Sequence, residues 1–173
     1  MFTPRSKIAE FSLKSIVLGL ILGLIFAVGN AYLALKIGTT VSASIPAAVL
    51  SMAILRLFFK RVTILENNLV QTIASVGEGL AAGVVFTVPA LFLLGETLSP
   101  LRIFILASLG GILGVLLMIP MRRYIIVKEH GKLPFPEGTA CAEILKSGQS
   151  NNSQALMAII GIAGGAIYKL VSN

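Results

Sequence analysis

The sequence predicts an all-α membrane protein, a polytopic bundle of transmembrane helices. Of its 173 residues, 56% are hydrophobic and only 12% are charged, whereas soluble domains average about 25% charged residues. The apolar residues also form runs of about 20 residues, the length that a helix needs to cross a hydrocarbon layer of about 30 Å. We therefore expect a single membrane domain over residues 1–173, with about five spans and one short helix.

The expected spans are placed by the apolar runs. The second run contains one base, Arg56, the third contains one acid, Glu78, and the last is shorter, rich in glycine and interrupted by Lys169. A cleaved signal peptide is the alternative for residues 1–35, but the first run exceeds the 7–15 residues of a signal-peptide core and more spans follow it. We expect spans over residues 15–35, 41–59, 69–94, 103–121 and 155–171.

Basic residues predict the orientation of the chain. If five helices alternate in direction, the loops on the side of the N-terminus receive most of the lysines and arginines. The positive-inside rule then places the N-terminus on the cytoplasmic side of the membrane, which we expect to be the plasma (inner) membrane. The net charge of +7 belongs to these short loops, so no nucleic-acid partner is expected. The residues on the cytoplasmic side are Arg5, Lys7, Lys14, Arg56, Lys60, Arg61, Arg122, Arg123, Lys128, Lys132 and Lys146.

Motifs for catalysis or cofactor binding are not expected in this chain. Gly131-Lys132 is followed by leucine and lacks the upstream glycine of a phosphate-binding loop. Glu129-His130 lacks the second histidine of a metalloprotease helix. With one cysteine and one histidine, a four-ligand zinc site is excluded as well. We expect no enzyme, no cofactor and no metal site.

Small residues recur at four-residue spacing in the predicted helices. Lipid gives helices no hydrophobic reason to associate, so faces of small residues let their backbones approach closely. These faces predict helix packing. The pairs are Gly19 with Gly23, Gly79 with Gly83, Gly110 with Gly114, and Gly161 with Gly165.

A polar stripe in the third span contains the strongest candidate for function. Asn68, Gln71, Ser75 and Glu78 are separated by steps of three and four residues, which place them on one helix face. A carboxylate within an apolar run must face a cavity or other helices, because contact with lipid costs at least a few kcal/mol. Glu78 is predicted to bind a proton or the cationic end of a substrate. The alternative is a structural hydrogen bond between helices.

A second candidate is the segment 133–145, Leu-Pro-Phe-Pro-Glu-Gly-Thr-Ala-Cys-Ala-Glu-Ile-Leu. Its prolines predict a short helix over about 136–146 that begins near Pro136, with Glu137 beside the positive end of the helix dipole. Such half-helices line binding sites in transporters, which makes Glu137 and Glu143 further candidates. The alternative is an amphipathic cytoplasmic linker.

Four sequence strings, read together, resemble the oligopeptide transporter family, in its bacterial and archaeal branch related to the yellow-stripe-like metal-chelate carriers. The resemblance extends over about residues 10–148 and implies a secondary transporter that couples uptake of oligopeptides or metal chelates to protons. The strings are Asn30-Ala31-Tyr32-Leu33 with Lys36-Ile37-Gly38, the stretch from Val41 to Ala48, Glu66-Asn67-Asn68 with the stretch from Gln71 to Glu78, and the stretch from Pro134 to Glu143.

The chain ends at Asn173, short of a full transporter of this kind, so we expect the N-terminal part of a larger protein. It would be a fragment, the product of a split gene, or a subunit completed by another chain or another copy. Two other functions stay open: a membrane scaffold or assembly subunit that transports nothing, and a channel-like carrier of small solutes formed by self-association. No residue distinguishes a peptide from a metal chelate, or a proton from another coupling ion.

Overall fold

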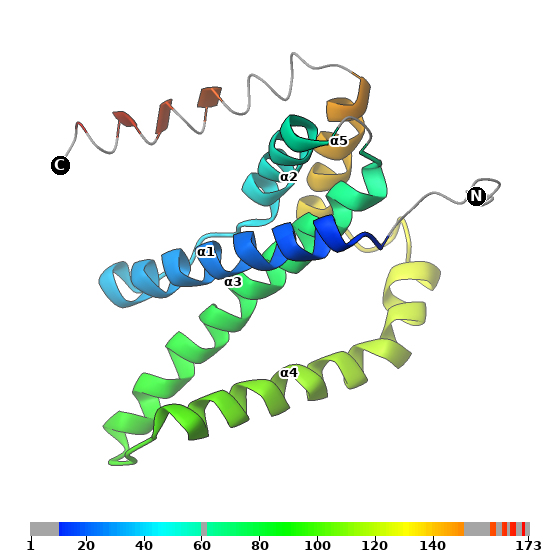
Figure 1. Ribbon diagram of the computed structural model, residues 1–173. Coiled ribbons are helices and arrows are strands. Elements are labelled where there is room, and N and C mark those ends of the chain that lie inside the picture. Colours follow the sequence, from blue (N-terminus) through cyan, green and yellow to red (C-terminus); the bar gives the residue numbers. More distant parts are fainter. Residues whose placement is uncertain are drawn as a thin grey trace.

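The computed structural model describes residues 11–59 and 62–150, together with the separate helical residues 160, 161, 164, 165, 167, 168 and 171. Regular secondary structure in this part is helical, which confirms the predicted all-α fold. Figure 1 shows α1 lying across α3, α2 beside α5, and α4 joined to α3 by a turn at one end. The elements are α1 (Leu13–Ile37), α2 (Ser44–Phe58), α3 (Ile64–Leu93), α4 (Pro100–Arg122), the π-helix η1 (Arg123–Lys128) and α5 (Pro136–Ser150).

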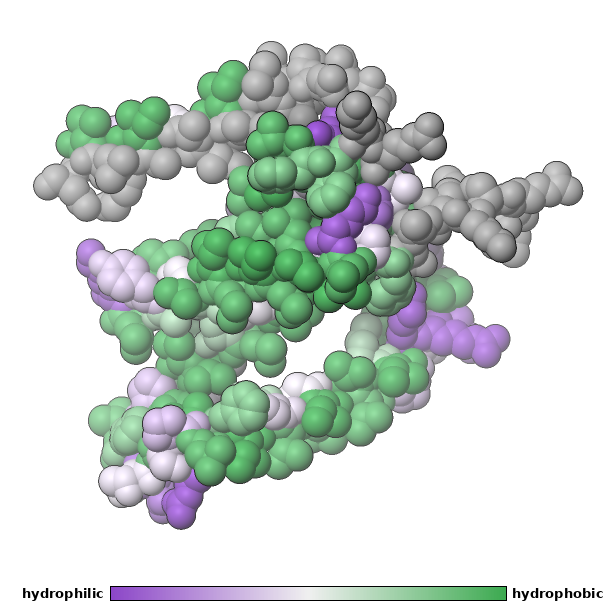
Figure 2. Space-filling view, in the orientation of Figure 1, coloured by the Kyte–Doolittle hydropathy of each residue, from purple (hydrophilic) through white to green (hydrophobic). Residues whose placement is uncertain are grey.

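Three segments are long and apolar enough to cross a membrane: α1, α3, and α4 together with η1. Each lies on one of the runs expected from the sequence. Figure 2 shows hydrophobic side chains covering the middle of the molecule and hydrophilic ones gathered toward the ends of its long helices. The helices therefore have the surface of a multi-pass membrane protein. Of the fifth expected span, 155–171, the structure describes only the separate helical residues given above, and the others lie outside the described residues.

The start of α3 is fixed by a capping box. The hydroxyl of Thr63 accepts a hydrogen bond from the backbone N–H of Glu66 at 3.1 Å, and the Glu66 carboxylate accepts one from the N–H of Thr63 at 3.0 Å. These reciprocal bonds satisfy two backbone donors that a helix start otherwise leaves unpaired. The helix consequently begins at Ile64, five residues before the span expected over 69–94.

Glycines bring α1 and α3 together. A Cβ built on Gly19 would lie 2.9 Å from the Cβ of Ile73, and one built on Gly23 would lie 3.3 Å from the carbonyl oxygen of the same residue. A Cβ on Gly77 would lie 2.5 Å from the carbonyl oxygen of Gly23. Only glycine allows so close an approach of two backbones. The packing role expected for Gly19 and Gly23 is confirmed.

The second expected span differs from the structure. The helix α2 begins at Ser44 rather than at residue 41 and has 15 residues, so it is about 22 Å long and shorter than the bilayer core. Pro46 lies in its first turn, where a missing N–H costs nothing. A kink at Pro46, which its position within an apolar run suggests, is therefore not formed. Loop residues 60 and 61 lie outside the described part.

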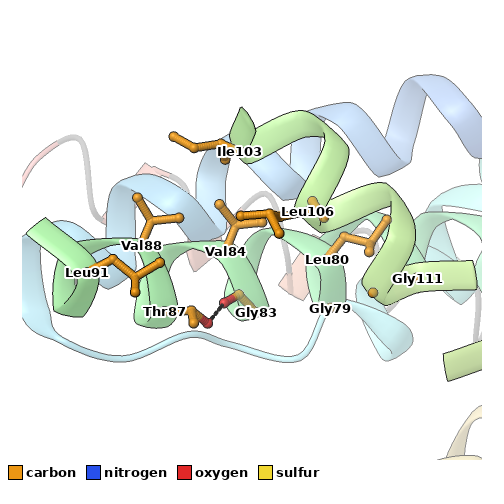
Figure 3. A pocket seen from close by; sticks show the side chains of 12 residues that line it. Gly79, Leu80, Gly83, Val84, Thr87, Val88, Leu91, Ile103, Leu106 and Gly111 are labelled. Atoms are coloured by element: carbon orange, nitrogen blue, oxygen red, sulfur yellow. Dashed lines mark hydrogen bonds between the residues drawn. The ribbon is translucent and has the colours of Figure 1, made fainter. Parts of the chain in front are cut away.

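The glycines of α3 and α4 have a different environment. Around Gly79, Gly83 and Gly110 an added Cβ would meet no atom within 4 Å, and these residues line a cavity of about 330 Å³ between the two helices. Figure 3 shows this cavity, in which the Thr87 hydroxyl donates a hydrogen bond to the carbonyl of Gly83. The close helix contact expected at these glycines is absent from the described part of the chain.

Candidate functional site

The chain between α1 and α2 runs back alongside α1. Asn30, which is 5% exposed, accepts a hydrogen bond from the backbone N–H of Val41 at 2.8 Å. Asn30 precedes the end of α1 at Ile37 by seven residues, so Val41 is held about 10 Å inside that end. The segment 39–43 is thus non-helical backbone at the depth of a membrane-spanning helix, an arrangement that is tolerated where it is buried in protein or lines a polar cavity.

The helix α5 docks on α2, and the two helices run in the same direction. At their N-terminal ends the Ser42 hydroxyl donates a hydrogen bond to Glu137, and at their C-terminal ends Arg56 donates one to the backbone carbonyl of Gly148. Between these contacts Leu145 is buried in a cluster with Ala48 and Met52. The helix expected over 136–146 is formed, continues to Ser150, and packs against the bundle (Figure 1).

Two carboxylates converge on the start of α2. Glu78, half-buried on α3, accepts a hydrogen bond from the backbone N–H of Ala43 at 3.3 Å. Glu137, at the start of α5, accepts one from the hydroxyl of the adjacent residue, Ser42. The hydroxyls of Ser44 and Ser75 are 2.8 Å apart and link α2 to α3 beside them. Acidic residues from two helices therefore hold one short segment of irregular backbone.

A groove of about 520 Å³ opens beside this segment. Its wall on α3 includes Gln71, whose amide nitrogen lies 4.0 Å from the sulfur of the buried Cys141 on α5. Backbone of the Pro-Phe-Pro stretch closes one side. The groove is more polar than the apolar cavity between α3 and α4. Its lining residues are Ser44, Gln71, Ser75, Pro134, Phe135, Pro136, Glu137, Gly138 and Cys141.

The electrostatics of the groove combine negative side chains with positive helix ends. Glu137 lies outside the three long spans. A hydrogen bond from Ser42 and, to a smaller extent, one from Ser44 lower the pKa of Glu137 below its ordinary value. Glu137 is therefore a carboxylate at neutral pH. The N-termini of α2 and α5 both lie at this groove, and the helix dipole places partial positive charge at each of them. Acidic, hydroxyl and dipolar groups thus surround one opening.

The structure separates the sequence-predicted residues into two sets. Glu78, Glu137 and Gln71 lie at or beside the groove. Asn68 is exposed near the start of α3, and Glu143 is exposed on α5. Neither of these two residues lines the groove.

Other residues of this region were not singled out from the sequence. Asn30 is one, and its signal was a polar amide within an otherwise apolar run. Glu66 is another. Besides its capping role it lies 3.0 Å from the ammonium of Lys14, which is 4.9 Å from the ring centre of Phe59. This contact joins the start of α1, the end of α2 and the start of α3, and the sequence signal for Glu66 was the spacing Thr-x-x-Glu before an apolar run.

Long apolar helices, a short helix pair and irregular backbone beside an acidic groove define a polytopic membrane protein of the transporter class. Residues 10–173 match the family described as OPT oligopeptide transporter protein. The chain belongs to this family, whose members are transporters. The resemblance inferred from the sequence strings is confirmed.

Two curated relatives extend the comparison. A Haemophilus influenzae protein named "Putative oligopeptide transporter" is 45% identical over 144 residues, and a Saccharomyces cerevisiae protein of the same description is 29% identical over 166 residues. In each comparison the match covers 82% of this chain and 22% of the relative. The chain therefore spans about a fifth of the length of these relatives. No solved structure matched it.

Proposed function

We propose that this chain forms part of a secondary active transporter that moves oligopeptides or metal chelates by symport with protons. The observation that supports this proposal is the convergence of Glu78 and Glu137 on Ser42 and Ala43, in the irregular segment 39–43 beside the polar groove. Membership of a transporter family supplies the class of activity. The groove supplies chemistry suited to its substrates, because peptides and chelates both present carboxylate and amine groups.

Each part of such a substrate has a complementary group in the groove. The N-termini of α2 and α5 favour a carboxylate, as the N-termini of broken helices do in other transporters. The ionised Glu137 attracts an amine or the cationic part of a chelate. Gln71 and Ser75 donate and accept hydrogen bonds without adding charge. The groove therefore offers groups that suit both the carboxylate and the amine of a zwitterionic substrate.

Glu78 is the proposed proton-binding residue. As a carboxylate it accepts the N–H of Ala43 and holds the segment in place. A proton on Glu78 removes its charge and weakens this bond, since hydrogen bonds to ionised acceptors are about twice as strong as neutral ones. Protonation would thus loosen the backbone beside the groove, and so connect the state of the proton site to the shape of the binding site.

In this proposal the N-terminus is cytoplasmic, the membrane is the plasma membrane, and the remainder of the transporter, or another copy of the chain, completes the pathway. The coverage of the relatives favours completion by further polypeptide. A scaffold subunit and a self-associating channel are the competing functions. Neither requires two carboxylates to hold irregular backbone at a polar groove.

The function is tested by uptake into sealed vesicles that contain the complete transporter polypeptide. Labelled peptides and labelled metal chelates are offered separately, with and without an inward proton gradient. Accumulation of one substrate class that depends on the gradient is the expected result. Equal uptake in vesicles lacking the protein would indicate a scaffold, and gradient-independent equilibration of small solutes would indicate a channel.

A further inference from the structure

A group of cations lies at one end of α4 and in η1. Arg122, Arg123 and Lys128 are exposed, and within the described part of the chain none of them takes part in an ion pair. Lys132 is different, because its ammonium lies 3.3 Å from Glu129, the one acid of this stretch. The basic end of α4, defined as Arg122, Arg123 and Lys128, therefore has three positive charges that no neighbouring acid offsets.

These cations follow directly on an apolar helix surface. No residue of α4 is buried, and its leucines and isoleucines other than Ile103 are exposed. Tyr124 is 59% exposed immediately after the helix, in the position that aromatic residues favour at a membrane–water interface. Figure 2 shows hydrophilic side chains beyond the hydrophobic surface of the long helices. The apolar helix suits the acyl chains of an anionic phospholipid, and the aromatic ring and the three cations at its end suit the interface and the negative headgroup.

The π-helix η1 contains two of these cations, Arg123 and Lys128. In η1 the N–H of Glu129 donates to the carbonyl of Tyr124 at 3.1 Å, five residues back. The ammonium of Lys128 also lies 5.9 Å from the centre of the Tyr124 ring, which restrains it near the interface. Such π-turns are frequent at functional sites.

We propose that the basic end of α4 binds the headgroup of an anionic phospholipid, with the acyl chains lying along the exposed face of α4. The arginines supply planar donors that suit a phosphate, and Lys128 supplies a third positive charge. The opposite end of α4 has a single exposed base, Arg102, near the exposed Glu96, and offers no equivalent group. The site is independent of the acidic groove.

The test measures lipid binding by the complete transporter polypeptide, purified in detergent. Phosphatidylglycerol, phosphatidylcholine and water-soluble glycerol 3-phosphate are titrated separately, and bound molecules are counted by native mass spectrometry. The proteins compared are the wild type, Arg122→Gln/Arg123→Gln, the charge-preserving Arg122→Lys/Arg123→Lys, and the matched control Arg102→Gln. Transport is not part of the readout, so failure of this proposal is separate from failure of the proposed function.

The wild type should bind phosphatidylglycerol in preference to phosphatidylcholine. Each cation near an anionic surface contributes about fivefold to binding, so the double glutamine variant should bind about 30-fold more weakly. The lysine variant should keep most of the affinity, and Arg102→Gln should match the wild type. Equal binding of the two lipids, undiminished binding by the glutamine variant, or full competition by glycerol 3-phosphate would each overturn the proposal. If the glutamine variant misfolds, Lys128→Gln should show a loss of about fivefold.

Discussion

Gly23 and Gly77 are in backbone contact where α1 crosses α3, since a Cβ on Gly77 would lie 2.5 Å from the carbonyl oxygen of Gly23. The variant Gly77→Ala should therefore separate the two helices and lower the free energy of unfolding by about 1–3 kcal/mol, as overpacking usually does. Gly79→Ala is the matched control, because its Cβ meets no atom within 4 Å. Unfolding in detergent, followed by circular dichroism, compares the two, and equal stability would exclude this crossing.

The bond between Asn30 and Val41 predicts a second stability effect. Replacing Asn30 by alanine leaves the N–H of Val41 without its acceptor, which should cost about 1–3 kcal/mol. Asn68→Ala, at an exposed position, should change stability by less than about 0.5 kcal/mol. Thermal unfolding measures both variants. Limited proteolysis should in addition cut residues 39–43 of the Asn30 variant faster, and an unchanged cleavage rate would show that the bond does not hold this segment.

Docking of α5 predicts slow amide exchange over residues 134–145. Leu145→Ala removes a side chain that is 3% exposed and should destabilise the α2–α5 contact by about 2–5 kcal/mol. Exchange in α5 should then accelerate strongly, whereas Glu143→Ala, on the exposed face, should leave it slow. Hydrogen exchange read by mass spectrometry distinguishes them. Fast exchange of the wild-type segment, at the rate of an unstructured peptide, would restore the linker interpretation.

The proposed orientation predicts which loops a reagent reaches from outside the cell. A cysteine at position 128 should resist a membrane-impermeant maleimide in intact cells, because η1 follows α4 on the cytoplasmic side. A cysteine at position 96, in the turn between α3 and α4, should react. Labelling of position 128 in sealed cells, with position 96 protected, would reverse the topology.

Much of the fold follows from the sequence because membrane helices depend on simple local quantities. Run length and scarcity of charge indicated the three long spans, and the spacing of Gly19 and Gly23 indicated a packing face. Boundaries were less certain. The apolar run predicted that the second span begins at residue 41, but the bond from Val41 to Asn30 draws the chain inward, and the helix begins at Ser44 with Pro46 in its first turn.

The candidate site was predicted in its parts but not as a whole. Glu78 stood out as an acid within an apolar span, and Glu137 as the first-turn residue of a short helix. Their meeting at Ser42 and Ala43 depends on the parallel docking of α5 on α2, a contact between residues 95 positions apart. Spacing along one helix contains no information on such a contact. The same limit explains why Asn68 and Glu143, which share helices with the site residues, point elsewhere.

If Glu78 couples substrate movement to protons, the variant Glu78→Gln should change how uptake depends on the pH gradient. Glutamine keeps the shape and an acceptor for the N–H of Ala43 but does not ionise. The complete transporter with Glu78→Gln should insert normally and bind substrate, yet its uptake should no longer respond to the gradient, whereas Glu143→Gln should behave as the wild type. Normal gradient-driven uptake by Glu78→Gln would show that Glu78 takes no part in proton coupling and is a structural hydrogen-bond acceptor.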